Sequence, residues 1–182
     1  MTTPRISVIV GSLRRESFAR KIAHEVLTMI PEGYEANIVE IRDLPLYDFD
    51  YDDPAVTDKP TPAEYTTFRE TIKNSSGILF ITPENNRTIP ACLKNAVDIG
   101  SKPNSDVAWK NLPAGIISHS VGRMAATVHR RTFASLCPTS TCRSLVSPKY
   151  FWANPPPFSK SPDISINVPQ TLSRITLCAS CS

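Results

Sequence analysis

No apolar run in the sequence is long enough to cross a lipid bilayer, and the first residues lead into a strand-like segment instead of a signal sequence. Lysine and arginine form no cluster long enough to follow a nucleic-acid backbone, and the net charge is only +3. These absences predict a cytoplasmic protein that binds neither membranes nor nucleic acids.

The sequence also lacks the usual metal and dinucleotide patterns. Its five cysteines show no paired spacing of the kind that a zinc site needs. Cys178 and Cys181 form a C-x-x-C pair, but no helix start accompanies it, so we predict no redox role for it. Neither G-x-G-x-x-G nor G-x-x-x-x-G-K-[ST] occurs, which excludes the two common glycine-rich phosphate loops.

What the sequence does contain is a regular alternation of strand-like and helix-like segments. Apolar runs typical of strands buried on both faces precede segments whose apolar residues stand three and four positions apart. Strands are expected at residues 5–10, 36–41, 77–82 and 114–119, with a candidate fifth strand at 143–147. Helices are expected from residue 17 to the stop at Pro31, and at 62–74, 89–99 and 123–136. This order predicts an α/β fold with a doubly wound parallel sheet, because parallel neighbours need crossover connections.

One domain is expected over residues 1–147, since 182 residues with 41% hydrophobic content suffice for a single core. From Cys137 onward the composition shifts to serine, threonine and proline, and no helical period follows. Residues 148–182 are therefore expected to form an atypical C-terminal segment that packs on the domain or extends from it.

The loop after the first predicted strand has the residues of a phosphate site. Backbone N–H groups at a helix start, the hydroxyls of Ser12 and Ser17, and the guanidinium of Arg14 suit a dianion. An ordinary turn in which Ser17 caps the following helix explains the same residues. Both interpretations stay open from this loop alone.

Polar residues also follow the third and fourth predicted strands. Pro83 sets the strand exit, and Glu84, Asn85 and Asn86 offer donors and acceptors to a planar heteroaromatic ligand. After the fourth strand, the segment from Ser118 to Gly122 lets the backbone approach a ligand edge. A turn that caps the next helix is the alternative in each case. In a doubly wound sheet these loops meet at the carboxyl ends of the strands, where ligands bind.

Three strings together resemble the NADPH-dependent FMN reductase family, which includes quinone, chromate and azo-dye reductases. They are Gly11-Ser-Leu-Arg14, the run from Pro83 to Pro90 with Leu93-Lys-Asn-Ala96 and Asp98, and the segment Ser118 to Gly122. The second string is the most specific, and the resemblance covers about residues 5–136. It implies a flavodoxin-like fold, with a five-stranded parallel sheet in the order 2-1-3-4-5.

The resemblance further implies FMN as the cofactor and NADPH or NADH as the hydride donor. The N-terminal loop would hold the phosphate, the loop after the third strand would line the isoalloxazine ring and ribityl chain, and the loop after the fourth would meet the pyrimidine edge. The implied cofactor-binding residues are Ser12, Arg14, Ser17, Phe18, Pro83, Glu84, Asn85, Asn86, Arg87, Ser118 and Gly122.

The resemblance implies an enzyme that needs no catalytic side chain, because the flavin N5 carries the chemistry. A hydride passes to the flavin, and two electrons then pass to a quinone-like, azo, chromate or flavin acceptor on the same face, which implies ping-pong kinetics. A small-molecule acceptor is thus the expected partner. The family also implies a homodimer or homotetramer.

Asn85 departs from the family's pattern, in which a tyrosine usually stands at this position. The missing aromatic ring removes about 1 kcal/mol of stacking. An alternative function therefore stays open, that of a non-catalytic flavodoxin-like scaffold or an FMN-binding electron carrier. Carriers tend to be acidic, and a net charge of +3 has the wrong sign for one.

Overall fold

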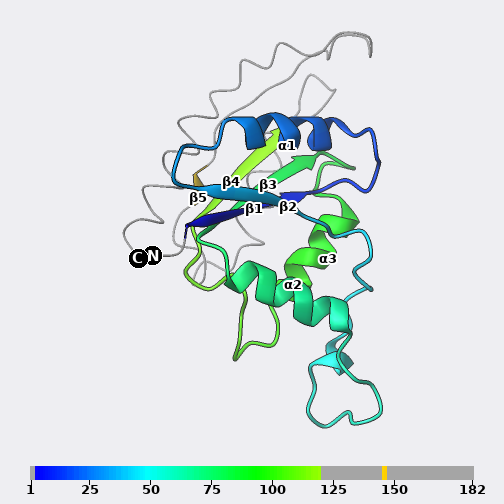
Figure 1. Ribbon diagram of the computed structural model, residues 1–182. Helices are drawn as coiled ribbons and strands as arrows, with labels where there is room; N and C mark the ends of the chain where they lie inside the picture. The colour runs from blue at the N-terminus through cyan, green and yellow to red at the C-terminus, as the bar shows by residue number, and fades with distance from the viewer. Residues whose placement is uncertain (1–2, 120–144, 147–182) are drawn as a thin grey trace.

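The computed structural model describes residues 3–119 and 145–146 (Figure 1). Five parallel strands form one sheet in the order β2-β1-β3-β4-β5, as predicted. The strands are β1 Arg5–Val10, β2 Glu35–Val39, β3 Gly77–Pro83, β4 Ala114–His119 and β5 Leu145–Val146. The predicted helix at 123–136 and the segment 148–182 lie outside the described residues.

Helices cover both faces of the sheet, with α1 on one face and α2 and α3 on the other (Figure 1). Their bounds are α1 Phe18–Thr28, α2 Ala63–Lys73 and α3 Ala91–Gly100, and a short 3-10 helix, η1, spans Phe49–Tyr51. Among the described residues, no helix has the length and apolar character that crossing a membrane requires.

Successive side chains of each strand point to opposite faces of the sheet, which divides the core into two layers. Ile6, Val8 and Val10 of β1 pack with the buried side chains of α1, whereas Ile9 points to the opposite face. That opposite layer contains Phe80 together with residues of α2 and α3. Burial of both faces explains why the strands read as continuous apolar runs.

Strand β2 ends at Val39, two residues before the expected end at Ile41. The prediction was wrong there because the pairing of β2 with β1 ends at Val39 opposite Ile9, and Glu40 and Arg42 beyond it make polar contacts outside the sheet. The Glu40 carboxylate accepts two hydrogen bonds from Arg20 at 2.6 and 2.9 Å, and Arg42 donates to the Leu13 carbonyl. The chain after Val39 is thus attached to α1 and to the loop that precedes it.

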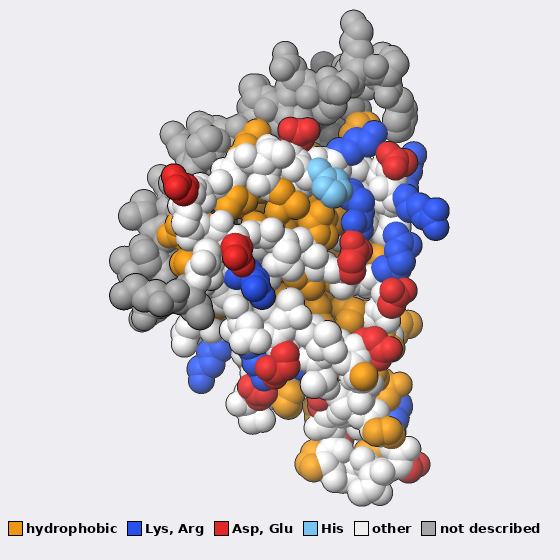
Figure 2. Space-filling view, viewed as in Figure 1, with side chains coloured by type: hydrophobic (Ala, Val, Ile, Leu, Met, Phe, Trp, Pro, Cys, Tyr) orange, Lys and Arg blue, Asp and Glu red, His pale blue; other side chains and the backbone are white. Residues whose placement is uncertain are grey.

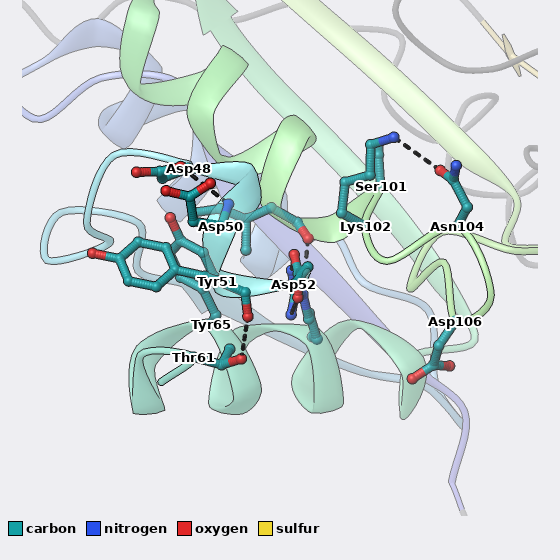
Figure 3. Close-up of polar contacts among 12 residues, drawn as sticks. Asp48, Asp50, Tyr51, Asp52, Thr61, Tyr65, Ser101, Lys102, Asn104 and Asp106 are labelled. Atoms are coloured by element: carbon teal, nitrogen blue, oxygen red, sulfur yellow. Dashed lines mark hydrogen bonds and ion pairs between the residues drawn. The ribbon is translucent and has the colours of Figure 1, made fainter. Parts of the chain in front are cut away.

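The long acidic segment between β2 and α2 is held by a buried ion pair. Arg69 of α2 binds both carboxylate oxygens of Asp52, at 2.8 and 2.6 Å, and donates through Nε to the Ile99 carbonyl at 2.9 Å. The side chains are only 8% and 5% exposed. Figure 3 shows Asp52 above α2, and Thr61 donating to the Tyr51 carbonyl at 2.6 Å. The segment is therefore an ordered part of the domain.

Replacing Arg69 with methionine is expected to lower the free energy of unfolding by about 3–5 kcal/mol, because the Asp52 carboxylate stays buried without its partner. Arg5→Met is the matched control, since it breaks an exposed pair with Glu35 and should cost less than about 1 kcal/mol. Urea denaturation of both variants measures the difference. Equal losses would contradict the role of the buried pair.

Candidate functional site

The loops after β1 and β3 and the end of β4 lie together at the carboxyl edge of the sheet. The N–H of Gly11, just past β1, donates to the Ile81 carbonyl of β3 at 2.8 Å. On the other side of β3, Thr82 is paired in register with Ser118, and the N–H of Glu84 donates to the His119 carbonyl at 3.1 Å. The sheet therefore brings the loops after β1 and β3 and the described end of β4 to one edge.

Gly11 permits a very close approach between β1 and β3. A Cβ atom at this position would lie 2.7 Å from the Oγ1 of Thr82 and 3.0 Å from a methyl carbon of Leu93. Thr82 is fully buried, and its hydroxyl donates to the Pro83 carbonyl at 2.9 Å. Only glycine leaves room for the loop to start at this point.

The loop between Gly11 and α1 presents backbone donors. Ser17 is the N-cap of α1, as one of the two interpretations predicted, and its hydroxyl oxygen accepts from the Arg20 N–H at 3.1 Å. Among the described residues, the N–H groups of Leu13, Arg15 and Glu16 have no hydrogen-bond acceptor, and all three residues are exposed. This donor set fits an anion, because it offers N–H groups beside a helix start.

The charge of this region also suits an anion. Arg14 is exposed on the loop, and its N–H donates to the hydroxyl oxygen of Ser12, which is half-buried at the exit of β1. Figure 2 shows Lys and Arg side chains, with acidic ones among them, on the side of the molecule where Figure 1 places this loop. Ser12 and Arg14 thus lie on the same loop as these N–H donors.

The segment after β3 forms a tight hairpin turn. Asn85 and Thr88 exchange two backbone hydrogen bonds, at 3.0 and 2.9 Å. Asn86 and Arg87 between them have φ angles of 51° and 63°, the signs that a type I′ turn requires. Asparagine tolerates this conformation, whereas arginine at positive φ costs about 1–2 kcal/mol. All three side chains of residues 85–87 are exposed beside the site.

The β4 side of the site is partly described. Ser118 and His119 are half-buried at the end of the strand, and Gly122 lies outside the described residues. The His119 ring packs edge-on against Phe18 at the start of α1, with centroids 6.2 Å apart. Pro83 and Glu84, on the adjacent strand, are also half-buried. Phe18 therefore connects the N-terminal loop to the end of β4.

The second half of the most specific sequence string, which lies in α3, makes contacts that stabilise the fold. Lys94 and Asp98 form an ion pair one turn apart on α3. The Asn95 side chain accepts from the Tyr47 N–H at 2.7 Å and donates to the Pro45 carbonyl at 2.9 Å. Sequence reasoning missed this contact, since its partners are 48 and 50 residues away. Asn95 holds the segment after β2 beside the site.

Two further titratable side chains, Cys92 and Tyr47, lie on or beside α3. Burial raises the pKa of the Cys92 thiol, so the thiol stays protonated at neutral pH. Burial likewise raises the pKa of the Tyr47 hydroxyl. The Tyr47 ring stacks on the ring of Tyr65, with centroids 6.2 Å apart. Both groups are therefore in their neutral, protonated form at neutral pH.

A hollow of about 560 Å³ between β2 and α2 is a separate feature. Ile38, Val39 and Phe68 contribute to its apolar part, and Glu40 and Glu64 are among its acidic residues. None of the predicted cofactor-binding residues lines it. Its negative charge disfavours a phosphate, so we place the candidate site at the carboxyl edge of the sheet.

Comparison with known proteins gives a consistent result. A family model described as NADPH-dependent FMN reductase matches residues 4–157. A quinone reductase from Pseudomonas putida is 44% identical over 117 residues, which cover 64% of this chain and 60% of that protein. A 2-hydroxy-1,4-benzoquinone reductase from a Burkholderia species is 38% identical over 133 residues, or 73% of this chain and 69% of that protein.

The fold has solved counterparts as well. The flavoenzyme NAD(P)H:(acceptor) oxidoreductase FerB from Paracoccus denitrificans superposes with a TM-score of 0.69 at 28% identity, covering 97% of this chain and 96% of that one. By sequence, the chain matches 60% of the length of the quinone reductase from P. putida. The predicted flavodoxin-like sheet is thus confirmed.

Replacing Gly11 with alanine is expected to lower the free energy of unfolding by about 1–3 kcal/mol, because the new Cβ meets the Thr82 hydroxyl. Thr82→Ala removes that oxygen. The double variant should therefore lose less free energy of unfolding than the sum of the losses in the two single variants. A double-mutant cycle by urea denaturation measures the coupling. Strict additivity would show that the close approach has no energetic role.

Proposed function

The chain belongs to the NADPH-dependent FMN reductase family, and on that premise we propose that it binds FMN and transfers two electrons from NAD(P)H to a small-molecule acceptor. Relatives named as quinone reductases favour a quinone-like acceptor, and azo compounds, chromate and flavins are the further candidates. NADPH, which the family description names, is the proposed donor, with NADH as the alternative.

The observation that carries this proposal is the convergence of the loops after β1 and β3 with the end of β4 at the carboxyl edge of the sheet. The Gly11 N–H donates a hydrogen bond to β3, and the Glu84 N–H donates one to β4. The start of the proposed phosphate loop and the 83–88 segment therefore leave adjacent strands. In open parallel sheets this edge is where ligands bind. An extended ligand with an anionic end and a polar aromatic end suits this arrangement.

We assign the anionic end to the loop between Gly11 and α1. The N–H groups of Leu13, Arg15 and Glu16 would donate to the phosphate oxygens, with the Ser12 hydroxyl and the Arg14 guanidinium beside them. Ser17 would contribute through the hydroxyl proton, because its oxygen already caps α1. The exposed surface of the loop leaves it accessible to a ligand.

We assign the ring system to the turn after β3 and to the end of β4. Pro83 and Glu84 would line it, with Asn85 and Asn86 at the hairpin tip and Ser118 on the adjacent strand. Bound FMN supplies the hydride chemistry, so the protein's own residues need only orient the ring and leave one side open. NAD(P)H and the acceptor would use that open side in turn, which gives ping-pong kinetics.

Arg87 combines a positive φ with a long side chain that does not favour this backbone conformation. It adopts a φ of 63° at the tip of the turn, where glycine or asparagine would fit at lower cost. Strain of this kind is typical of functional positions. We propose that its exposed guanidinium attracts the anionic cofactor or acceptor.

Purified protein incubated with FMN is expected to retain the flavin after desalting and to show its visible absorption. It should then oxidise NADPH in the presence of a quinone, with parallel double-reciprocal plots because the kinetics are ping-pong. Flavin binding without NAD(P)H oxidation would indicate an electron carrier. Protein that stays colourless and inactive would indicate a scaffold, and either result would refute the proposed enzyme.

We further propose that the protein works in the cytoplasm, where NAD(P)H is supplied, as a homodimer or homotetramer. Two large apolar side chains support association, since Leu46 is 81% and Phe49 55% exposed on the segment after β2. The Asn95 contacts and the buried Asp52 pair keep this segment ordered, which lowers the entropic cost of binding.

The double variant Leu46→Asp with Phe49→Asp is expected to be a monomer at micromolar concentration, whereas the unchanged protein elutes as a dimer or tetramer. Light scattering coupled to gel filtration measures both masses. Thr57→Asp, an exposed polar position on the same segment, is the control and should leave the mass unaltered. A monomeric unchanged protein would contradict the proposed assembly.

A further inference from the structure

The segment that leaves β2 contacts the loop between β1 and α1 in one place and the first turn of α1 in another. The guanidinium of Arg42 donates to the backbone carbonyl of Leu13, in the middle of the loop. Two residues earlier, the Glu40 carboxylate holds Arg20, whose own N–H is capped by Ser17. The bidentate contact lowers the pKa of Glu40, so the carboxylate is charged at neutral pH.

These contacts add to a third one at the start of the loop, where the Gly11 N–H donates to Ile81. The loop is therefore attached at its first residue, near its centre and just past its end. Its attachments at the centre and past the end both come from the exit of β2, and within the described part of the chain Arg42 makes the contact to the Leu13 carbonyl.

The central contact has a specific consequence for an anion. A loop that binds phosphate must turn N–H groups toward the ligand and keep carbonyl oxygens away, because carbonyl dipoles repel negative charge. Arg42 engages the Leu13 carbonyl, while the N–H groups of Leu13, Arg15 and Glu16 have no acceptor among the residues that the structure describes. The contact thus holds one carbonyl in place and leaves the donors available.

We infer that Arg42 is a positioning residue for the FMN phosphate, acting through the Leu13 carbonyl. This inference rests on the proposed function, since it concerns the same cofactor site. Arg42 lies 25 residues or more from every residue of the predicted phosphate loop, as its 29-residue separation from Leu13 illustrates. It therefore belongs to no motif that the sequence displays.

The test compares FMN with riboflavin, which has the same ring and ribityl chain without the phosphate. Arg42→Ala is expected to weaken FMN binding about tenfold, or about 1.4 kcal/mol, while riboflavin affinity stays within about twofold of that of the unchanged protein. Flavin fluorescence quenching measures both affinities. Arg5→Ala is the matched control, because it removes the same charge from an exposed ion pair at the opposite end of the sheet.

Salt separates positioning from simple attraction between charges. About 0.5 M salt screens exposed charges, so a loss caused only by the missing charge shrinks toward zero, whereas a loss caused by the displaced loop persists. The inference requires a persistent loss. It is overturned if the loss disappears in salt, if Arg42→Ala binds FMN normally, or if both flavins weaken equally.

The unchanged protein provides the remaining comparison. If it fails to bind FMN, the proposed function itself fails and the inference falls with it. If it binds FMN and Arg42→Ala binds equally well, only the role of Arg42 is refuted. Thermal unfolding of each variant confirms that the domain is folded, and Arg42 is exposed, so its removal leaves the core intact.

Discussion

The site depends on the close parallel pairing of β1 with β3. Gly11 bonds to the Ile81 carbonyl and lies against the Thr82 hydroxyl, so the backbone leaves β1 directly beside the exit of β3. The N-terminal loop and the segment after β3 thus leave neighbouring strands at the same edge, and the register of β3 with β4 brings in Ser118. A wider separation of these strands would divide the site.

Charged residues in this protein mostly organise loops. Arg69 and Asp52 hold the acidic segment to α2 from a buried position, while Arg20 and Glu40 join α1 to the exit of β2. Arg42 likewise attaches the loop after β1 by donating a hydrogen bond to the Leu13 carbonyl. Loops bear the ligand-binding residues in such folds, and they need a rigid support to present those residues in one geometry.

The most specific sequence string serves two purposes. Its first half forms the hairpin turn with Asn86 and Arg87 at positive φ, next to the ligand edge. Its second half is helix α3, where Leu93 is buried and Asn95 holds the segment after β2. One continuous string therefore encodes a hairpin turn beside the candidate site together with the support of a distant loop.

The sequence by itself determined the order of strands and helices, because apolar periodicity and turn residues are local signals. It also indicated Ser17 as a cap and the edge at which polar loops collect. The early end of β2, the buried Arg69–Asp52 pair, the Asn95 contacts and the hydrogen bond from Arg42 to Leu13 were decided only by tertiary structure. These contacts join residues that are far apart in the chain. Apolar periodicity describes only local structure, so it does not predict which distant carbonyl or carboxylate a polar side chain will contact.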